Sequence, residues 1–236
     1  MTRHLALLTL LATIAFALSP LTTSGFNGFT SGQFPVPQVD PAVQPAGYAF
    51  SIWGVIYLWL ILGAGYGLWK RADDADWQRM RPPLIASLAV GAFWIPVANV
   101  SPIAATVMIW AMLLGALIAL MRAGRGDHGW QRAPVALYAG WLTAASCVSL
   151  GLVVAGHGLM SSQTAALLAL ALALAVALAV SLLRRDTPAY GVAVIWALVG
   201  VIVSNLQPVN GTVIALCVLG IAILSWFTLR SLRRTV

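Results

Sequence analysis

The side chains with the clearest potential for ligand chemistry are aromatic, and three of them stand close together in one stretch. Phe50, Trp53 and Tyr57 follow one another at steps of three and four residues, which places their rings on one face of a helix. Pro45 and Gly47 interrupt regular structure just before that helix. Either the stripe packs against neighbouring helices, or it lines a pocket for a flat apolar ligand.

Groups that usually perform catalysis or bind metals are scarce. The chain contains no acidic pair, histidine cluster, phosphate-binding glycine loop or nucleophile elbow. Cys147 and Cys217 fall in apolar runs, which predicts buried free thiols and no disulfide or metal site. His157 fits a solvated turn. We therefore expect no enzymatic activity, no metal and no required cofactor.

Composition indicates an integral membrane protein. Of the 236 residues, 61% are hydrophobic and 8% are charged, which is too much apolar surface for one soluble core. The expected partner is therefore the lipid bilayer. The formal charge of +7 would suggest a nucleic-acid partner in a soluble protein, but here its placement indicates topology, and we expect no nucleic acid.

Charged residues divide the chain into four long blocks, and only Asp40 interrupts one of them. Each block is roughly twice the ~20 residues that one span needs, and each has a polar or Pro/Gly-rich break near its middle. The blocks therefore predict four helical hairpins in an all-α, polytopic transmembrane bundle of about eight spans. The predicted spans are residues 5–23, 47–69, 83–100, 103–121, 134–155, 164–183, 190–206 and 212–229.

Orientation follows from the basic residues, because all thirteen Lys and Arg lie at one set of span ends. By the positive-inside rule both termini are cytoplasmic and the loop from Ser24 to Gly47 faces outward. The expected location is a bacterial inner (cytoplasmic) membrane. Residues 5–21 predict a retained helix that completes the fourfold hairpin pattern, although a basic start before an apolar run also fits a cleaved signal peptide.

The basic side should also hold a connector and anchoring rings. The charged stretch from Lys70 to Arg81 reads as a solvated connector. Tryptophans near the cytoplasmic span ends are expected to be interfacial anchors, and these are Trp69, Trp77, Trp130 and Trp226.

Neutral polar residues inside the spans are further candidates for ligand contact. Hydroxyls at three-residue spacing and amides at outer span ends supply them, namely Thr143, Ser146, Ser149, Asn99, Asn205 and Gln207. Hydrogen bonds between helices explain such groups as well as a ligand does. Gly63 and Gly67 form a small-residue pair that suits close helix contact, either inside the bundle or between the protomers of a homodimer.

Several motifs together resemble the TspO/MBR family, the tryptophan-rich sensory proteins related to the mitochondrial translocator protein. The residues that carry the resemblance are Pro45-Ala46-Gly47-Tyr48-Ala49-Phe50-Ser51-Ile52-Trp53 with Tyr57, Trp94-Ile95-Pro96, and Tyr138 with Trp141 and Ala145. They look like the family's start of helix two, its Trp-Ser-Pro in helix three and its Tyr-x-x-Trp-x-x-x-Ala in helix five. Phe50 and Trp53 are three apart where shorter members have four.

The resemblance covers roughly residues 5–156. The chain is therefore identified as a longer, divergent member, with a TspO-like five-helix region over residues 1–156 and three additional transmembrane helices over residues 157–236. Both parts are expected to form a single integral membrane unit.

The resemblance implies a pocket for porphyrins, sterols or other flat lipophilic molecules beneath the loop between helices one and two. A proline-rich loop is stiff enough to act as its lid. The implied role is that of sensor, scavenger or carrier, with a porphyrin or similar molecule as bound ligand. The candidate site residues are Tyr48, Phe50, Trp53, Tyr57, Trp94, Asn99, Tyr138, Trp141 and Ser149.

Two other classes of function fit the sequence. The first is a small-molecule transporter or permease whose path runs between the hairpins, with Asn99, Asn205 and Gln207 on its outer side. The second is an accessory subunit of a larger membrane complex, with Gly63, Gly67 and the Ala-rich span near residues 165–183 as contact surfaces.

Overall fold

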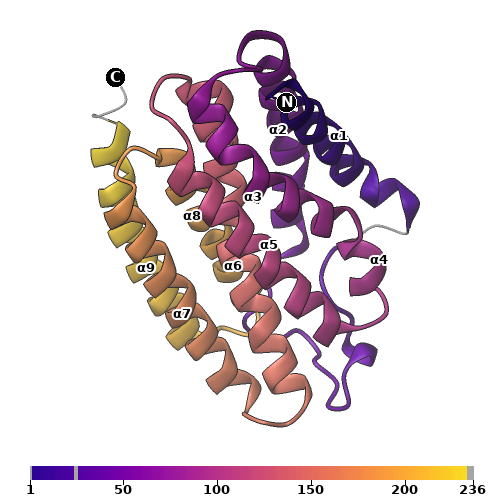
Figure 1. Cartoon of the computed structure of the whole chain (residues 1–236). Helices are drawn as coiled ribbons and strands as arrows, with labels where there is room; N and C mark the ends of the chain where they lie inside the picture. Colours follow the sequence, from indigo (N-terminus) through magenta and orange to yellow (C-terminus); the bar gives the residue numbers. More distant parts are fainter. Residues whose placement is uncertain (1, 24–25, 233–236) are drawn as a thin grey trace.

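A computed structural model describes residues 2–23 and 26–232, and within that part the chain is an all-α bundle (Figure 1). The long helices are α1 (Thr2–Leu18), α2 (Ile52–Lys70), α3 (Ala75–Ala92), α5 (Pro102–Arg122), α6 (Ala133–Gly156), α7 (Ser162–Leu183), α8 (Pro188–Ser204) and α9 (Gly211–Leu232). The short elements are η1 (Ser19–Thr22), η2 (Ser31–Gln33), η3 (Gly47–Ser51), α4 (Trp94–Ala98) and the π-helical η4 (His128–Arg132).

Six helical segments of the described part are long and apolar enough to cross a membrane. They are Arg3–Leu21, Gly47–Lys70, Pro102–Arg122, His128–Gly156, Ser162–Leu183 and Gly211–Leu232. Helix α8 is apolar but shorter, and α3 carries Asp76, Arg79 and Arg81 in its first turns. The prediction of a helical membrane bundle is therefore confirmed.

Local sequence sets where the helices begin. The Asp74 carboxylate accepts hydrogen bonds from the backbone N–H groups of Asp76 and Trp77, and the Ser101 and Ser161 hydroxyls accept from residues three positions later. These side chains satisfy backbone donors that the first helical turn leaves unpaired. Proline stands at the first position of α5 and α8, where its missing N–H has no cost.

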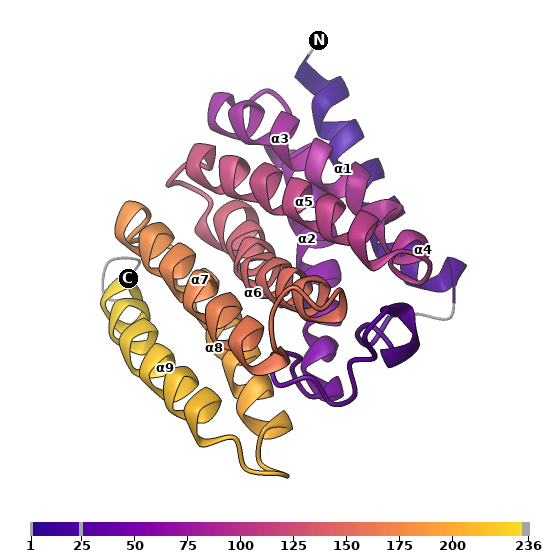
Figure 2. The same ribbon diagram turned by 90° about the horizontal axis from the view of Figure 1, so that it is seen from below.

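Helix α6 lies in the middle of the molecule, between the first helices and the group α7, α8 and α9 (Figure 2). Four hydroxyls on α6 hydrogen-bond to three neighbouring helices. Tyr138 bonds to Ser87 of α3, Thr143 bonds to Tyr190 of α8, and Ser149 bonds to Thr106 of α5, while Ser146 donates to the Ile109 carbonyl of α5. The polar stripe of α6 therefore holds the bundle together, as the interhelical interpretation predicts.

Helix α1 packs against α2 and α3. The Phe16 ring is buried in the core against the rings of Trp53, Tyr57 and Tyr138, with centroid distances of 5.0–5.7 Å. Helix α1 therefore packs as part of this bundle, in the place that the hairpin pattern predicts for a first helix.

The prediction of a solvated connector from Lys70 to Arg81 is wrong. Helix α3 begins at Ala75, so only a short turn separates it from the end of α2 at Lys70. The Arg81 side chain is buried and donates to the carbonyls of Gly67, Arg71 and Ala72, so it satisfies acceptors at the end of α2. Trp77 is buried as well and is not an interfacial anchor, whereas Trp69, Trp130 and Trp226 are exposed, as an anchor requires.

The predicted span 83–100 also differs from the structure, which contains two helices there. Helix α3 ends at Ala92, and the short α4 follows from Trp94. Pro96 lies four residues after Ala92, and its ring cannot pack against that carbonyl within a continuous helix. The chain bends at this point, and the bend turns Trp94 into the bundle.

Gly63 and Gly67 make contacts inside the chain, which is one of the two alternatives left open above. A Cβ at Gly63 would lie 2.3 Å from the Trp130 carbonyl oxygen, and one at Gly67 would lie 2.4 Å from the Trp77 ring. Both glycines are buried. A homodimer that forms directly through this pair would have to displace those contacts.

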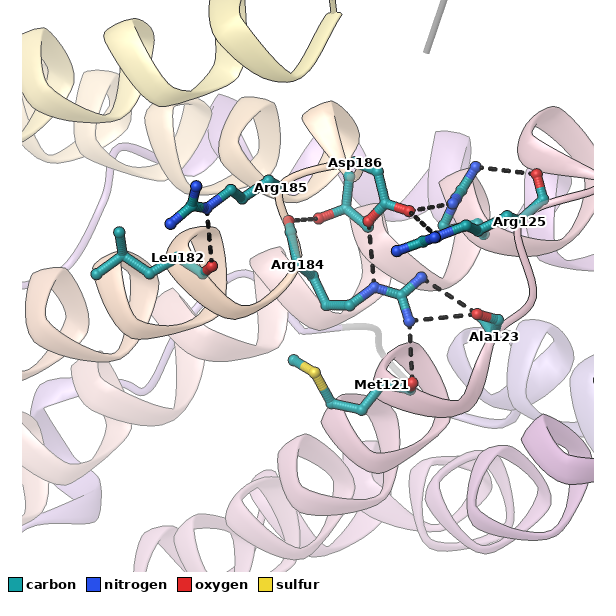
Figure 3. A network of polar contacts seen from close by, with 9 residues as sticks. Met121, Ala123, Arg125, Leu182, Arg184, Arg185 and Asp186 are labelled. Atoms are coloured by element: carbon teal, nitrogen blue, oxygen red, sulfur yellow. Dashed lines mark hydrogen bonds and ion pairs between the residues drawn. The ribbon is translucent and has the colours of Figure 1, made fainter. Parts of the chain in front are cut away.

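We call the end of the bundle where α1 begins and α2, α5, α7 and α9 end the basic end, and the opposite end the loop end (Figure 1). Asp186 joins three segments at the basic end. It accepts from Arg132 and Arg184 and lies 3.8 Å from Arg125 (Figure 3). Arg184 also donates to the carbonyls of Met121 and Ala123. Burial alone raises the pKa of Asp186, but Arg184 and Arg132 outweigh it and hold the pKa below its usual value.

Asp127 is the second charged hub of the basic end. Its carboxylate accepts from Arg71 Nε at 2.7 Å, from Trp77 Nε1 at 2.9 Å and from the Tyr66 hydroxyl at 3.3 Å. Burial raises the pKa of Asp127, but these donors stabilise the charged form more strongly, and the pKa lies below its ordinary value. Asp127 thus connects the ends of α2 and α3 to the segment before α6.

We expect Asp127→Asn to lower the stability of the bundle by about 2 kcal/mol, because charge-assisted hydrogen bonds to Arg71 and Trp77 are weakened. The depressed pKa means that the wild-type contribution is present above pH ~4 and is lost as the pH falls through the folded-state pKa. Thermal melts of detergent-solubilised protein at pH 7 and pH 3 measure both effects. A wild-type advantage that is the same at both pH values would contradict this role of the carboxylate.

Candidate functional site

An apolar cavity lies near the loop end, between α6 and the helices around it. Its walls come from η3, α2, α4, α5, α6, α7 and α8 and from the loop before η3. The main lining residues are Phe26, Phe29, Val43, Gln44, Pro45, Phe50, Trp53, Trp94, Ile109, Trp141, Cys147, Ser149, Ala173, Ala197 and Val201. The volume that the centre of a water molecule can reach is about 50 Å³, which is room for a few waters.

The roof of the cavity is the long loop, residues 26–46. Backbone and side-chain hydrogen bonds fasten it to two helices, α6 and α8. The Val36 N–H donates to the Gly156 carbonyl, the Ala46 N–H donates to the Gly200 carbonyl, and the Asn205 amide donates to the Ala42 carbonyl. The loop therefore covers the ends of α6 and α8, in the position that the sequence predicts for a lid (Figure 2).

Aromatic side chains of the long loop form the inner surface of the roof. Phe26 contacts Trp94 with a centroid distance of 4.7 Å, and Phe29 lies between Phe26 and Phe34. At Gly28 the φ angle is +112°, and a Cβ there would collide with the Gln44 side chain. Glycine alone adopts that φ readily, so it lets the loop turn back over the cavity.

Trp53 and Phe50 form the wall between this cavity and a second hollow. Trp53 lies edge to face against Trp141 at 6.1 Å and is stacked on Tyr57 at 5.4 Å, and Phe50 lies edge to face against Trp141 at 5.9 Å. The shared helix face predicted for these rings is thus confirmed. Edge-to-face and offset pairs of this kind are favourable arrangements for aromatic rings.

The second hollow is a groove on the outside of this wall, which we call the side groove. It lies between α1, η1, α2 and α4, and its residues include Phe16, Pro20, Phe26, Phe50, Trp53, Tyr57 and Trp94. The volume open to the centre of a water molecule is about 380 Å³. Phe26, Phe50, Trp53 and Trp94 line both hollows, so four rings separate the cavity from the groove.

Two polar groups of the cavity lining have no hydrogen-bond partner within the described part of the chain. They are Trp141 Nε1 and Gln44 Oε1, and both atoms are buried. By contrast, Trp94 Nε1 donates to the Ala105 carbonyl and Trp196 Nε1 donates to the Ala49 carbonyl. An unpaired buried donor is costly, so the Trp141 N–H is the strongest polar feature of the cavity.

The structure gathers five of the nine candidate residues at the cavity, and Tyr57 joins the side groove. The five are Phe50, Trp53, Trp94, Trp141 and Ser149. The Ser149 hydroxyl is already bonded to Thr106. Tyr138 is fully buried next to Trp53, but it lies outside the cavity lining and its hydroxyl bonds to Ser87.

Two candidates, Tyr48 and Asn99, lie away from the cavity. The Tyr48 side chain is 45% exposed and packs on Trp196, because the 3₁₀ geometry of η3 turns it away from Phe50. Asn99 is exposed in the turn between α4 and α5. Tyr48 stands two residues before Phe50 and Asn99 five residues after Trp94, but neither side chain lines the cavity.

Sequence reasoning missed the contributions of Ile109, Cys147, Ala173, Ala197 and Val201. For Cys147 a signal existed, because Trp141, Ala144, Val148 and Leu152 recur at helical spacing along the same face of α6. No comparable signal marked α7 and α8, because the family motifs that indicate a pocket all lie before residue 157. The small side chains Ala173 and Ala197 leave the space that the cavity occupies.

Among the described residues, no group of three His, Cys, Asp or Glu side chains is placed to hold a metal ion. Both cysteines are buried. The cavity therefore offers shape, aromatic surface and one indole donor.

The fold and the cavity define a class, the α-helical integral membrane proteins with an aromatic-lined cavity beneath a loop. Within that class, a family model described as TSPO-like protein matches residues 3–230. The chain therefore belongs to the TSPO-like family, as its motifs indicate. The match extends well past residue 156, so the region of similarity read from the motifs is too short. Neither a curated protein nor a solved structure matches the chain.

We expect Ala173→Leu, which fills the cavity, to change the melting temperature little, because the added carbons enter existing space. Ala116→Leu is the matched control, since Ala116 is fully buried in the core and lies outside the cavity lining. Overpacking there should cost about 1–3 kcal/mol. Thermal melts of both variants make the comparison. Equal destabilisation would mean that no usable space exists near Ala173.

Proposed function

We propose that this TSPO-like protein binds a lipophilic small molecule in the cavity beneath the long loop and acts as a sensor, scavenger or carrier without covalent chemistry. The observation that carries the proposal is the buried Trp141 N–H, which lines an apolar cavity and has no acceptor within the described residues. A ligand with an apolar body and one hydrogen-bond acceptor would satisfy it.

Size restricts how a flat ligand can bind. Typical sites for drug-sized ligands measure roughly 300–1,000 Å³, far above the cavity with its rings as they stand. A porphyrin or sterol would therefore have to move the wall of Phe26, Phe50, Trp53 and Trp94 and occupy the side groove together with the cavity. Smaller apolar molecules would need less movement. The side groove supplies a route of access from the side of the bundle.

The direct test of the site is Trp141→Phe, which keeps an aromatic ring and removes the N–H. With protoporphyrin IX as the probe, we expect the dissociation constant to rise about tenfold, the effect of losing one hydrogen bond in a dry site. Trp69→Phe is the control, because Trp69 is 77% exposed at the basic end. The binding is followed by the porphyrin absorption band.

If the Trp141→Phe variant and the wild type bind the porphyrin with equal affinity, the Trp141 N–H does not contribute to binding. If the wild type binds a smaller apolar probe but no porphyrin, the ligands are limited to molecules that fit in the cavity without moving the rings of Phe26, Phe50, Trp53 and Trp94.

A transporter or permease is the alternative, and Gln207 offers one observation in its favour. Gln207, Asp40 and Gln38 line a polar hollow above the roof, and Gln44 and Pro45 line both this hollow and the cavity. A substrate path would therefore cross the roof at Gln44. Substrate flux into proteoliposomes would favour transport, and saturable binding without flux would favour the binding protein. An accessory subunit would instead co-purify with a larger complex.

For the membrane arrangement we propose eight spans, with α3, α4 and α8 completing the six apolar segments, and with both termini in the cytoplasm. The basic residues of the described part are gathered at the basic end, as the ion pairs of Arg3 with Asp73 and of Arg71 with Asp127 illustrate, and this end would be cytoplasmic by the positive-inside rule. The loop end would face outward.

This orientation predicts that a membrane-impermeant maleimide labels Val39→Cys in intact cells, since Val39 is 73% exposed in the long loop. Asp73→Cys, exposed at the basic end, should be labelled only after permeabilisation. The native Cys147 and Cys217 are buried and give a low background. The reverse pattern of labelling would invert the topology.

A further inference from the structure

A groove separate from the cavity opens at the basic end, between the last turns of α7 and α9. We call it the α7–α9 groove. Its lining is Ser181, Leu182 and Arg185 on one side and Phe227, Arg230 and Ser231 on the other. The volume open to the centre of a water molecule is about 200 Å³. Helices α7 and α9 lie along one flank of the bundle (Figure 1).

Two arginines give the α7–α9 groove a positive charge that no acidic side chain of the described part neutralises. Arg185 donates from Nε to the Leu182 carbonyl, and the Arg230 guanidinium carbon lies 4.2 Å from the centre of the Trp226 ring. Asp186 is adjacent in sequence, but its ion pairs are with Arg125, Arg132 and Arg184. Figure 3 shows Arg185 directed toward Leu182, away from that cluster.

The remaining walls of the α7–α9 groove are apolar. Leu182 and Phe227 belong to the apolar segments Ser162–Leu183 and Gly211–Leu232, which are long enough to cross a membrane. The outward surfaces of these helices continue this character, with exposed Leu168, Leu172, Leu219 and Ile223. The groove therefore combines charge at the membrane surface with an apolar path into the bilayer.

We propose that the α7–α9 groove binds the headgroup of an anionic phospholipid. The phosphate lies between the guanidinium groups of Arg185 and Arg230, because planar guanidinium groups recognise phosphate oxygens in pairs. The acyl chains follow Leu182 and Phe227 along the flank of the bundle. Basic pockets between helices at a membrane surface recognise lipid headgroups in this way.

A lipid fits these observations better than a soluble phosphate compound does. Soluble anions gain nothing from Leu182 and Phe227, whereas a lipid covers both residues. The exposed Trp226 beneath Arg230 also suits the interface between headgroups and acyl chains. This site depends neither on the cavity nor on the ligand proposed for it.

The experiment compares wild-type protein with the double variant Arg185→Gln, Arg230→Gln by native mass spectrometry in detergent, with dioleoylphosphatidylglycerol as the probe. We expect the wild type to retain the lipid and the double variant to bind it at least tenfold more weakly. Arg122→Gln is the matched control, because Arg122 is exposed at the same end outside the groove. It should bind like the wild type.

Three further measurements decide the chemistry. Dioleoylphosphatidylcholine should bind the wild type much more weakly, and inorganic phosphate at millimolar concentration should not displace phosphatidylglycerol. The double variant Arg185→Lys, Arg230→Lys should retain part of the binding, because the charge remains. It is also the control for a loss of binding caused by misfolding. Equal losses in Arg122→Gln, or displacement by inorganic phosphate, would overturn the proposal of a lipid site.

Discussion

The structure depends on one physical constraint, the burial of α6 in the middle of an apolar bundle. A helix in that position has no water to satisfy its polar side chains, so each hydroxyl has to find a partner on a neighbouring helix. Tyr138, Thr143, Ser146 and Ser149 do so on three different helices. These hydrogen bonds fix the rotation of α6 and thereby decide which of its residues face the cavity.

The same rotation explains why the cavity exists. Toward the loop end, α6 presents Trp141, Ala144, Val148 and Leu152 to one side, and α7 and α8 contribute alanine, valine and leucine side chains on the other, with alanines at positions 169, 173 and 197. Small residues on two helices opposite a tryptophan leave unfilled space. The long loop closes that space because its backbone is fastened to Gly156, Gly200 and Asn205. The cavity is therefore a product of the C-terminal helices as much as of the first five.

The two ends of the bundle have different chemistry. At the basic end, ion pairs centred on Asp127 and Asp186 join segments that are distant in sequence. Arg185 and Arg230 take no part in these ion pairs. At the loop end, aromatic contacts and hydrogen bonds to the backbone hold the segments together. The proposed lipophilic ligand and the proposed anionic lipid would therefore bind at opposite ends of the bundle.

The sequence by itself determined the membrane class, most of the helices, the clustering of basic residues at one end, the shared face of Phe50, Trp53 and Tyr57, and the family. These properties follow from composition and local periodicity, which need no knowledge of partners. Only the tertiary structure decided that Arg81 and Trp77 are buried, that Tyr48 and Asn99 lie away from the cavity, that Ser149 is already bonded to Thr106, and that α7 and α8 complete the cavity wall. Each of these depends on contacts between residues far apart in the chain, and the spacing of residues along one helix carries no record of what the neighbouring helix offers.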